Sequence, residues 1–544
     1  MIHLARKSTP QRTLIGFSFR QSIKGTVGVA LVACLELIVQ GVAYQKTYST
    51  LHAQAKFAAT LAKAPGLGFI YGDPANLNAG TAGYMVYRVL GFFGVIAAVW
   101  AVVSISQQLR GCEEDGRWEL IRSEAISSAR ANWSVLVGFV YAWLVSVIVA
   151  FIITFGAFHG DHISITPKAL WLLDLAILLP GFAFAGVGVL VSQLAQSRGR
   201  ALIYGIVPIG ILFLLRGVAN TDSASWHWLL YVSPFGWAQL INPVLGPNTA
   251  WLLALAAFGI VFALLGLKLT DRDYGESVIL ESQTATSHYG FLGRPWQLAL
   301  RQNSLMLTGW TLGALILISL ISALASTATS AIKSSVNLNR PLHKLGGGSN
   351  NIEIAFLGAG ILFMIMVLLT MSIHILGSVR RDEAKQYLDS ILVAPKRRTT
   401  WLASRLILAF GCVLLVSLLG GFAMLIIAHG EHISLDFWKV IATCVCAVGT
   451  VGFLIGFGAL LYGILPRLTM IGMYVVIGWS FLIILLSSAA KLNSLYMHST
   501  LFNYTNFNLA NWPDWSTFGW MMVSGIILSL VGIYLFNRRD IVPE

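Results

Sequence analysis

The chain has 544 residues and a formal net charge of +13; 56% of its residues are hydrophobic, only 11% are charged, and its mean hydropathy is +0.75. Soluble domains carry about 25% charged residues, so this composition excludes an ordinary soluble enzyme, a disordered protein and a nucleic-acid-binding domain. It predicts one large body of membrane helices, in which the excess of basic residues marks the cytoplasmic loops.

The first apolar run, residues 25–44, follows a basic stretch and could be mistaken for a signal peptide. It is long enough to span a bilayer and longer than the core of a signal sequence. No small-residue cleavage site follows it. We therefore expect a retained transmembrane helix. The preceding residues 1–24 are predicted either to lie as an amphipathic helix in the inner interface or to form a disordered basic flank.

Twelve apolar runs of spanning length occur in two groups of six. Because backbone amides in lipid must be satisfied internally, each run is predicted to be a helix. Both chain ends are predicted to be cytoplasmic, since 25 of the 36 Lys and Arg residues then fall in inner segments. The approximate bounds are 25–45, 85–106, 134–156, 171–195, 201–219, 249–268, 305–325, 353–377, 402–427, 437–462, 468–488 and 515–536.

The two groups of six resemble each other in sequence. The segment 159–164 reads His-Gly-Asp-His-Ile-Ser, and the segment 429–434, which lies 270 residues later, reads His-Gly-Glu-His-Ile-Ser. Such self-similarity indicates a tandem repeat. Six is an even number, so the halves have the same orientation, as in parallel transporter repeats. The fold prediction is therefore all-α, with six-helix halves at 25–275 and 305–544 joined by a cytoplasmic linker at 276–304.

The loops after the second helix of each half carry the most informative motif. Residues 110–122 and 380–388 both place neighbouring acidic residues shortly before a base and then a leucine. A short helix with charges on one face could rest on the membrane and present those charges to a cytosolic partner. The alternative is an ordinary solvated loop. Glu114 and Asp382 take equivalent places in this comparison.

No motor is visible in the sequence. Phosphate cradling requires Gly-x4-Gly-Lys-Ser/Thr, and Gly111-x4-Gly116 lacks both the lysine and the hydroxyl residue. We therefore predict that the chain is not an enzyme and binds no cofactor itself, and that any ATP-driven transport takes its energy from a separate subunit.

The motif after the second helix resembles that of the ABC-2 type permeases of bacterial ABC exporters, in the fused double-length form, and in particular of the tetronasin-type multidrug efflux permeases. In the first half the pattern is Arg, two acids, Gly-Arg, Glu-Leu and a later Arg-x-x-Trp, and a partial form of it recurs in the second half. The resemblance implies a bacterial plasma membrane protein that works with two copies of a cytosolic ATPase, which binds the ATP and Mg. It also implies connecting helices within 1–24 and 276–304.

By position, the resemblance assigns ATPase coupling to one set of residues in each loop. These are Glu113, Glu114, Gly116, Arg117, Glu119, Asp382, Glu383, Lys385 and Leu388. The second half departs from the pattern with Ala384 in place of Gly116 and Tyr387 in place of Glu119, so the two coupling sites are expected to be unequal. The segment 231–237, with Ser-Pro-Phe at its centre, resembles the family's outer re-entrant motif; the alternative is a plain aromatic belt.

Four charged residues, Glu36, Arg88, Asp174 and Arg216, fall inside predicted spans, all in the first half. Intramembrane charges are functional hypotheses by default, and internal salt pairing for stability is the alternative. Methionine and aromatic residues in the spans suit promiscuous apolar ligands or plain packing. The predicted substrate path consists of Glu36, Arg88, Phe92, Tyr204, Arg216, Met364, Met473 and Tyr474.

The repeated His-Gly-acid-His motif could in principle bind zinc, but a helix-ending glycine turn is the better interpretation, and no metal site is predicted. The function predicted is the permease subunit of an ATP-driven exporter of hydrophobic or amphipathic compounds. The rivals are a proton-coupled secondary antiporter and a permease for lipid or glycan export.

Overall fold

Helices are the regular secondary structure throughout the described part of the chain. The computed structural model describes residues 10–62, 68–69, 71–122, 126–160, 163, 165–220, 224–270, 277–278, 295–325, 352–384, 398–489, 494–505 and 507–539. Within those residues the chain forms two compact units, Met1–Gln283 and Thr284–Glu544. The division falls inside the linker predicted at 276–304.

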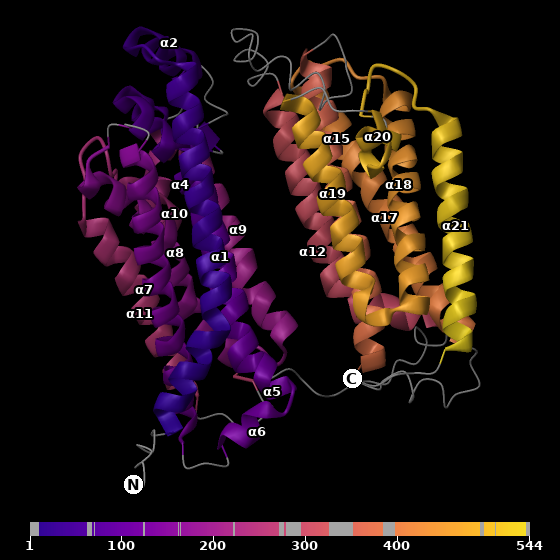
Figure 1. The fold of residues 1–544 in the computed structure, drawn as a ribbon, viewed down its shortest axis with the longest axis horizontal. Helices are drawn as coiled ribbons and strands as arrows, with labels where there is room; N and C mark the ends of the chain where they lie inside the picture. The colour runs from indigo at the N-terminus through magenta and orange to yellow at the C-terminus, as the bar shows by residue number, and fades with distance from the viewer. Residues whose placement is uncertain are drawn as a thin grey trace. The chain divides into compact units, whose positions relative to one another are not determined.

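The first unit packs its long helices around α4 and α8, which are its most buried spans. Figure 1 shows it in indigo to magenta, with the short helices α5 and α6 at one end and α2 at the other. Its elements are α1 (Pro10–Thr47), α2 (Leu51–Ala62), η1 (Pro74–Ala79), α4 (Gly80–Ser106), η2 (Gln107–Gly111), α5 (Cys112–Glu114), α6 (Arg117–Arg122), α7 (Ser128–Gly160), α8 (Pro167–Leu194), α9 (Arg198–Ala219), η3 (Ala224–Tyr231), α10 (Pro234–Leu240) and α11 (Ala250–Lys268).

The second unit has α15 and α18 as its most buried spans. Figure 1 draws it in rose to yellow. Its elements are α12 (Pro295–Ala323), α15 (Ile352–Ala384), α17 (Arg398–Gly430), α18 (Phe437–Ile464), η5 (Pro466–Leu468), α19 (Thr469–Ala489), α20 (Ser494–His498), η6 (Leu501–Tyr504) and α21 (Trp515–Arg538).

The helix α1 is longer than a membrane is thick. Its 38 residues would extend about 57 Å at 1.5 Å per residue, against about 30 Å of hydrocarbon. Every fourth residue from Leu14 to Ala30 is buried, and this period places one stripe of the helix against its neighbours. Ser18, for example, donates a hydrogen bond from Oγ to the carbonyl oxygen of Val135 in α7, 2.8 Å away. The described part of the predicted segment 1–24 thus continues into the span as one helix.

Eleven helices in the described residues are long and apolar enough to cross a membrane. Each coincides with a predicted run, and α19, at the position of the remaining run, is a helix that is not among the eleven. The prediction of an all-helical multi-pass membrane protein is confirmed at this level.

Glycines allow the closest helix contacts in both units. A Cβ added to Gly186 in α8 would collide with the carbonyl oxygen of Gly259 in α11, and one added to Gly456 in α18 would collide with that of Gly525 in α21. Small residues let membrane helices approach closely, where van der Waals contact replaces the missing hydrophobic force. These glycines therefore allow α8 to approach α11 and α18 to approach α21 closely.

Substitution of Gly525 by leucine is expected to destabilise the second unit strongly. Its Cβ would lie 2.6 Å from the carbonyl oxygen of Gly452, and overpacking of a core costs about 1–3 kcal/mol. We expect a lower thermal unfolding temperature of the purified protein and less protein in membranes. Gly519→Leu on the same helix is the control, because an added Cβ there meets no atom within 4 Å. Equal losses in both variants would contradict this account of α21.

Candidate functional site

The coupling segment predicted in the first half begins with a break in helical register. At the end of α4 the chain forms a π-type turn, η2, and then the single turn α5. A π-turn adds a residue to the helix and is frequent at functional sites. Gly116 follows with φ +73°, a left-handed conformation that favours glycine, and this turn reverses the chain into α6. The segment therefore forms a compact projection at the end of α4.

The inner face of this projection is tied to the loop between α8 and α9. Arg110, 2% exposed, pairs with Glu113 at 2.7 Å between Nη1 and Oε2, and its Nε donates to the carbonyl oxygen of Gln196 at 3.0 Å. The backbone N–H of Arg198 donates to Oε1 of Glu114 at 2.7 Å. These bonds connect the projection to the junction of α8 and α9.

The outer face of the projection carries most of the predicted coupling residues. Glu114, Gly116, Arg117 and Glu119 are exposed, whereas Glu113 faces inward. The Arg117 side chain, 57% exposed, pairs with Asp115 at 2.7 Å, and a pair exposed to this degree contributes little to stability. These charges are accessible to a partner.

The acidic residues of the second segment pair with arginines elsewhere in the second unit. Asp382 pairs with Arg405 at 2.6 Å, and Glu383, whose side chain is fully buried, pairs with Arg539 at 2.8 Å. Lys385 and Leu388 lie outside the described residues. The two predicted coupling segments thus differ: the first exposes Glu114, Arg117 and Glu119, whereas both acidic residues in the described part of the second pair with arginines of the same unit.

Two arginines of the predicted path meet at the other end of the first unit, around Tyr71. The guanidinium carbon of Arg88 lies 4.1 Å from the centroid of the Tyr71 ring. Arg216, 0% exposed, donates from Nη2 to the Tyr71 carbonyl oxygen at 2.8 Å and from Nε to Oε1 of Gln239 at 3.1 Å. Asn220 and Gln239 bind each other through both amide groups, at 2.7 and 3.0 Å.

This polar network holds the short helix α10 inside the bundle. Ser233 caps α10, and its Oγ donates to the carbonyl oxygen of Leu212 in α9 at 2.7 Å. Phe235, 1% exposed, stacks on Phe184 of α8 with 5.5 Å between ring centroids. The sequence motif pointed to this turn, but it did not indicate Tyr71, Gln239 or Asn220, whose polar groups matter only because the fold brings them to Arg216.

Glu36 does not pair with either arginine. Its Oε1 accepts a hydrogen bond from Nε2 of Gln40 at 2.7 Å, and Oε1 of Gln40 accepts one from the Tyr84 hydroxyl at 3.1 Å. The Tyr84 ring stacks on Tyr44 at 4.2 Å. A half-buried carboxylate beside a tyrosine cluster is therefore the first-half feature that could attract a cationic compound.

The remaining residues of the predicted path have unequal surroundings. Met364 and Met473 are 0% exposed and belong to the core of the second unit. Phe92 is 53% and Tyr474 is 42% exposed, and Tyr204 is half-buried. Asp174, the fourth charged residue inside a predicted span, was not assigned to the path. It is 2% exposed and accepts a hydrogen bond from Thr154 at 2.9 Å.

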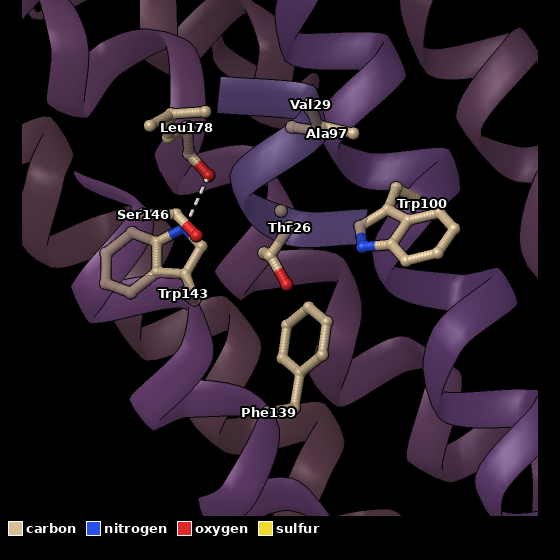
Figure 2. A pocket seen from close by; sticks show the side chains of 9 residues that line it. Thr26, Val29, Ala97, Trp100, Phe139, Trp143, Ser146 and Leu178 are labelled. Atoms are coloured by element: carbon tan, nitrogen blue, oxygen red, sulfur yellow. Dashed lines mark hydrogen bonds between the residues drawn. The ribbon is translucent and has the colours of Figure 1, made fainter. Parts of the chain in front are cut away.

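A small cavity lies in the first unit where α1, α4, α7 and α8 meet (Figure 2). Its volume is about 10 Å³, which suits about one water molecule and is far below the hundreds of Å³ of a drug site. The indole of Trp143 donates to the carbonyl oxygen of Leu178 at 2.8 Å. The cavity is therefore a packing feature and not a cargo pocket.

The second histidine motif forms a helix end. His432 has φ +58°, and the N–H of Ile433 donates to the carbonyl oxygen of Ala428 at 2.9 Å, as in helix-terminating turns. In the parts of the chain that the structure describes, no group of three His, Cys, Asp or Glu residues could hold a metal ion. In the first copy, residues 161 and 162 lie outside the described part.

Comparison with known proteins supports the membrane-transport interpretation. Residues 292–537 match the family described as the multidrug efflux system permease Rv1217c, C-terminal domain. The chain is also 24% identical over 507 residues to the multidrug efflux system permease protein Rv1217c of Mycobacterium tuberculosis, covering 91% of this chain and 89% of the relative. Over most of its length the chain is thus similar to a multidrug efflux permease. The resemblance inferred from the loop motif is confirmed at that level, and so is a multi-pass membrane location.

Substitution of Glu36 by glutamine is expected to change cargo preference more than stability. The glutamine oxygen can still accept the hydrogen bond from Gln40, but the charge is lost. Export of cationic compounds should fall by up to about fivefold relative to neutral ones, because a partly exposed ionic contact contributes up to about 1 kcal/mol. The measurement is drug tolerance of expressing cells against paired cationic and neutral compounds.

The matched control for Glu36 is Leu317→Ala, at a half-buried position of α12 that carries no charge. It should leave the ratio of cationic to neutral export unchanged. An unchanged ratio for Glu36→Gln as well would remove Glu36 from the cargo path.

Proposed function

We propose that the chain is the transmembrane permease subunit of an ATP-driven exporter of the ABC-2 type, which moves hydrophobic or amphipathic compounds, drugs among them, out of a bacterial cell. The observation that carries this proposal is the relationship to a multidrug efflux permease over 91% of the chain. The exposed charged projection after α4 provides a place for a separate ATPase to bind. Two copies of that ATPase would supply the energy, with ATP and Mg bound on them.

Recurring burial supports a parallel repeat of twelve helices. Buried positions 18, 22 and 26 of α1 are matched by 299, 303 and 307 of α12, a shift of 281. Buried Arg110 and Glu113 are matched by Arg380 and Glu383, a shift of 270, and α19 takes the place of α9. In this register Glu113 corresponds to Glu383, and Glu114 corresponds to Ala384 and has no acidic counterpart. The connecting helices and cytoplasmic chain ends belong to the same proposal.

The charged projection of the first half would seat the ATPase. Glu114 both lies on its surface and binds the N–H of Arg198. Closure of the ATPase pair would push the projection, and the bonds to Gln196 and Arg198 would carry that motion into α8 and α9. Cargo would pass along a path that includes Glu36 and the network around Arg216.

A proton-coupled antiporter is the second candidate, favoured by the buried carboxyl of Asp174. Co-purification with the ATPase encoded beside the permease, followed by reconstitution in vesicles, separates the two. We expect transport to require ATP and to survive dissipation of the proton gradient. Transport driven by a proton gradient without ATP would refute the exporter proposal. A screen of drugs, lipids and glycans for stimulation of ATP hydrolysis would identify the cargo class.

A further inference from the structure

Two consecutive acidic residues organise one end of the second unit. Nη2 of Arg405 donates to Oδ2 of Asp382 at 2.6 Å and to Oε1 of Gln302 at 2.9 Å. Glu383 accepts hydrogen bonds from the Tyr462 hydroxyl at 2.6 Å and from Nη2 of Arg539 at 2.8 and 3.0 Å. We call these six residues the Asp382–Glu383 cluster.

The cluster joins five long helices. Gln302 lies in α12, the two acids in α15, Arg405 in α17 and Tyr462 in α18, and Arg539 follows the last residue of α21. The carbonyl oxygen of Arg539 also accepts a hydrogen bond from Nη1 of Arg398 at the start of α17, 3.1 Å away. Asp382 and Glu383 therefore connect the end of α15 to the ends of the four other long helices in the cluster.

Stability alone is a weak reason for such a cluster. Buried ion pairs lose much of their attraction to desolvation, and apolar replacements of the same volume are often as stable. A set of charge-assisted hydrogen bonds with fixed geometry is suited to keeping several helix ends in register. In the first unit Glu113 pairs with Arg110 three residues away, and Arg110 in turn donates to the carbonyl oxygen of Gln196.

We infer that Asp382 and Glu383 are positioning residues that transmit movement of the second coupling segment to α12, α17, α18 and α21 together. This inference rests on the proposed function, since the movement comes from the ATPase. The acids act through the arginines and Tyr462 inside the permease and do not contact the ATPase. A single movement of the second coupling segment would thus shift the five helices α12, α15, α17, α18 and α21 together.

The test compares transport with ATP hydrolysis in vesicles that hold the permease and its ATPase. Asp382→Asn and Glu383→Gln should leave drug-stimulated hydrolysis near the wild-type rate and lower the drug transported per ATP by at least about fivefold, within the range of measured coupling effects. Asp514→Asn is the control: this carboxylate caps α21 at its opposite end, and its loss should leave the ratio unchanged. A ratio unchanged in all three variants would overturn the inference.

A charge exchange adds a readout that a purely structural role would not give. Glu383→Arg alone should abolish coupling, and adding Arg539→Glu should restore part of the transport per ATP. If neither variant reaches the membrane, the drug transported per ATP is measured in Tyr462→Phe instead, which removes one hydrogen bond to Glu383. Restored protein level without restored ratio would overturn the inference. Wild-type vesicles that need no ATP would instead refute the proposed function.

Discussion

Reversal of two charges on the exposed projection of the first half, by Glu114→Lys with Glu119→Lys, is expected to lower ATP-dependent efflux by about tenfold or more while the protein still inserts in the membrane. Like charges brought together across an interface cost several kcal/mol, so an ATPase that fits this surface would be repelled. Both side chains are exposed, and the buried Arg110–Glu113 pair remains. The measurements are ATPase recovered with the tagged permease and drug efflux from cells.

The control for this variant reverses a single charge at another place. Glu431→Lys, just beyond the C-terminal end of α17, replaces one negative charge by a positive one. The amount of ATPase recovered with this variant should equal that recovered with the wild type. Glu119→Lys alone separates docking from the internal bond of Glu114 to Arg198. Normal ATPase recovery and efflux by the double variant would mean that the projection is not a docking surface.

Asp382 requires a different experiment from Glu114. Its carboxylate faces Arg405, whose side chain is 3% exposed, so a lysine there would place two cations together inside the unit. Loss of efflux in Asp382→Lys would report that internal clash and not ATPase docking. For this reason the amide variant Asp382→Asn is the informative one in the second half.

Spanning helices were predictable from sequence because hydrophobic length is a property of each run by itself. The apolar runs coincide with helices in both units, and the Ser-Pro-Phe motif indicated the break before α10, where Ser233 caps the helix and Pro234 occupies its first turn. Proline can occupy that first turn because its missing N–H is not needed there. These features depend on residues near one another in the chain.

The direction of the acidic side chains was not predictable by the same means. Whether Glu383 faces solvent or Arg539 depends on a residue 156 positions away, and no local pattern records that contact. The partners of the Arg216 side chain likewise come from two separate segments, at Tyr71 and Gln239. Sequence reasoning therefore predicted two acidic coupling segments, but it could not tell which of their charges bind inside the protein.

At the end of the first unit that carries Tyr71 and α10, the largest loss of stability is expected from Arg216→Leu. Arg216 is fully buried and bonds the segment before η1, at Tyr71, to α10, at Gln239. Each hydrogen bond to a charged group contributes about 1.5–3 kcal/mol, so its removal should destabilise the first unit and release α10. Lysine cannot reproduce the planar fork of donors, and Arg216→Lys should fall between leucine and wild type.

The matched variant is Arg88→Leu, because Arg88 is close to the same tyrosine but stacks on its ring. A cation–π contact at a partly exposed site contributes about 0.5–1 kcal/mol, so a smaller loss is expected. Thermal unfolding of purified protein and drug efflux per molecule in the membrane measure the two effects separately. A buried arginine costs about 2.5–3.5 kcal/mol to insert. A rise in unfolding temperature for Arg216→Leu would therefore show that insertion cost outweighs its bonds, and α10 would then be held chiefly by Ser233 and the stacking of Phe235.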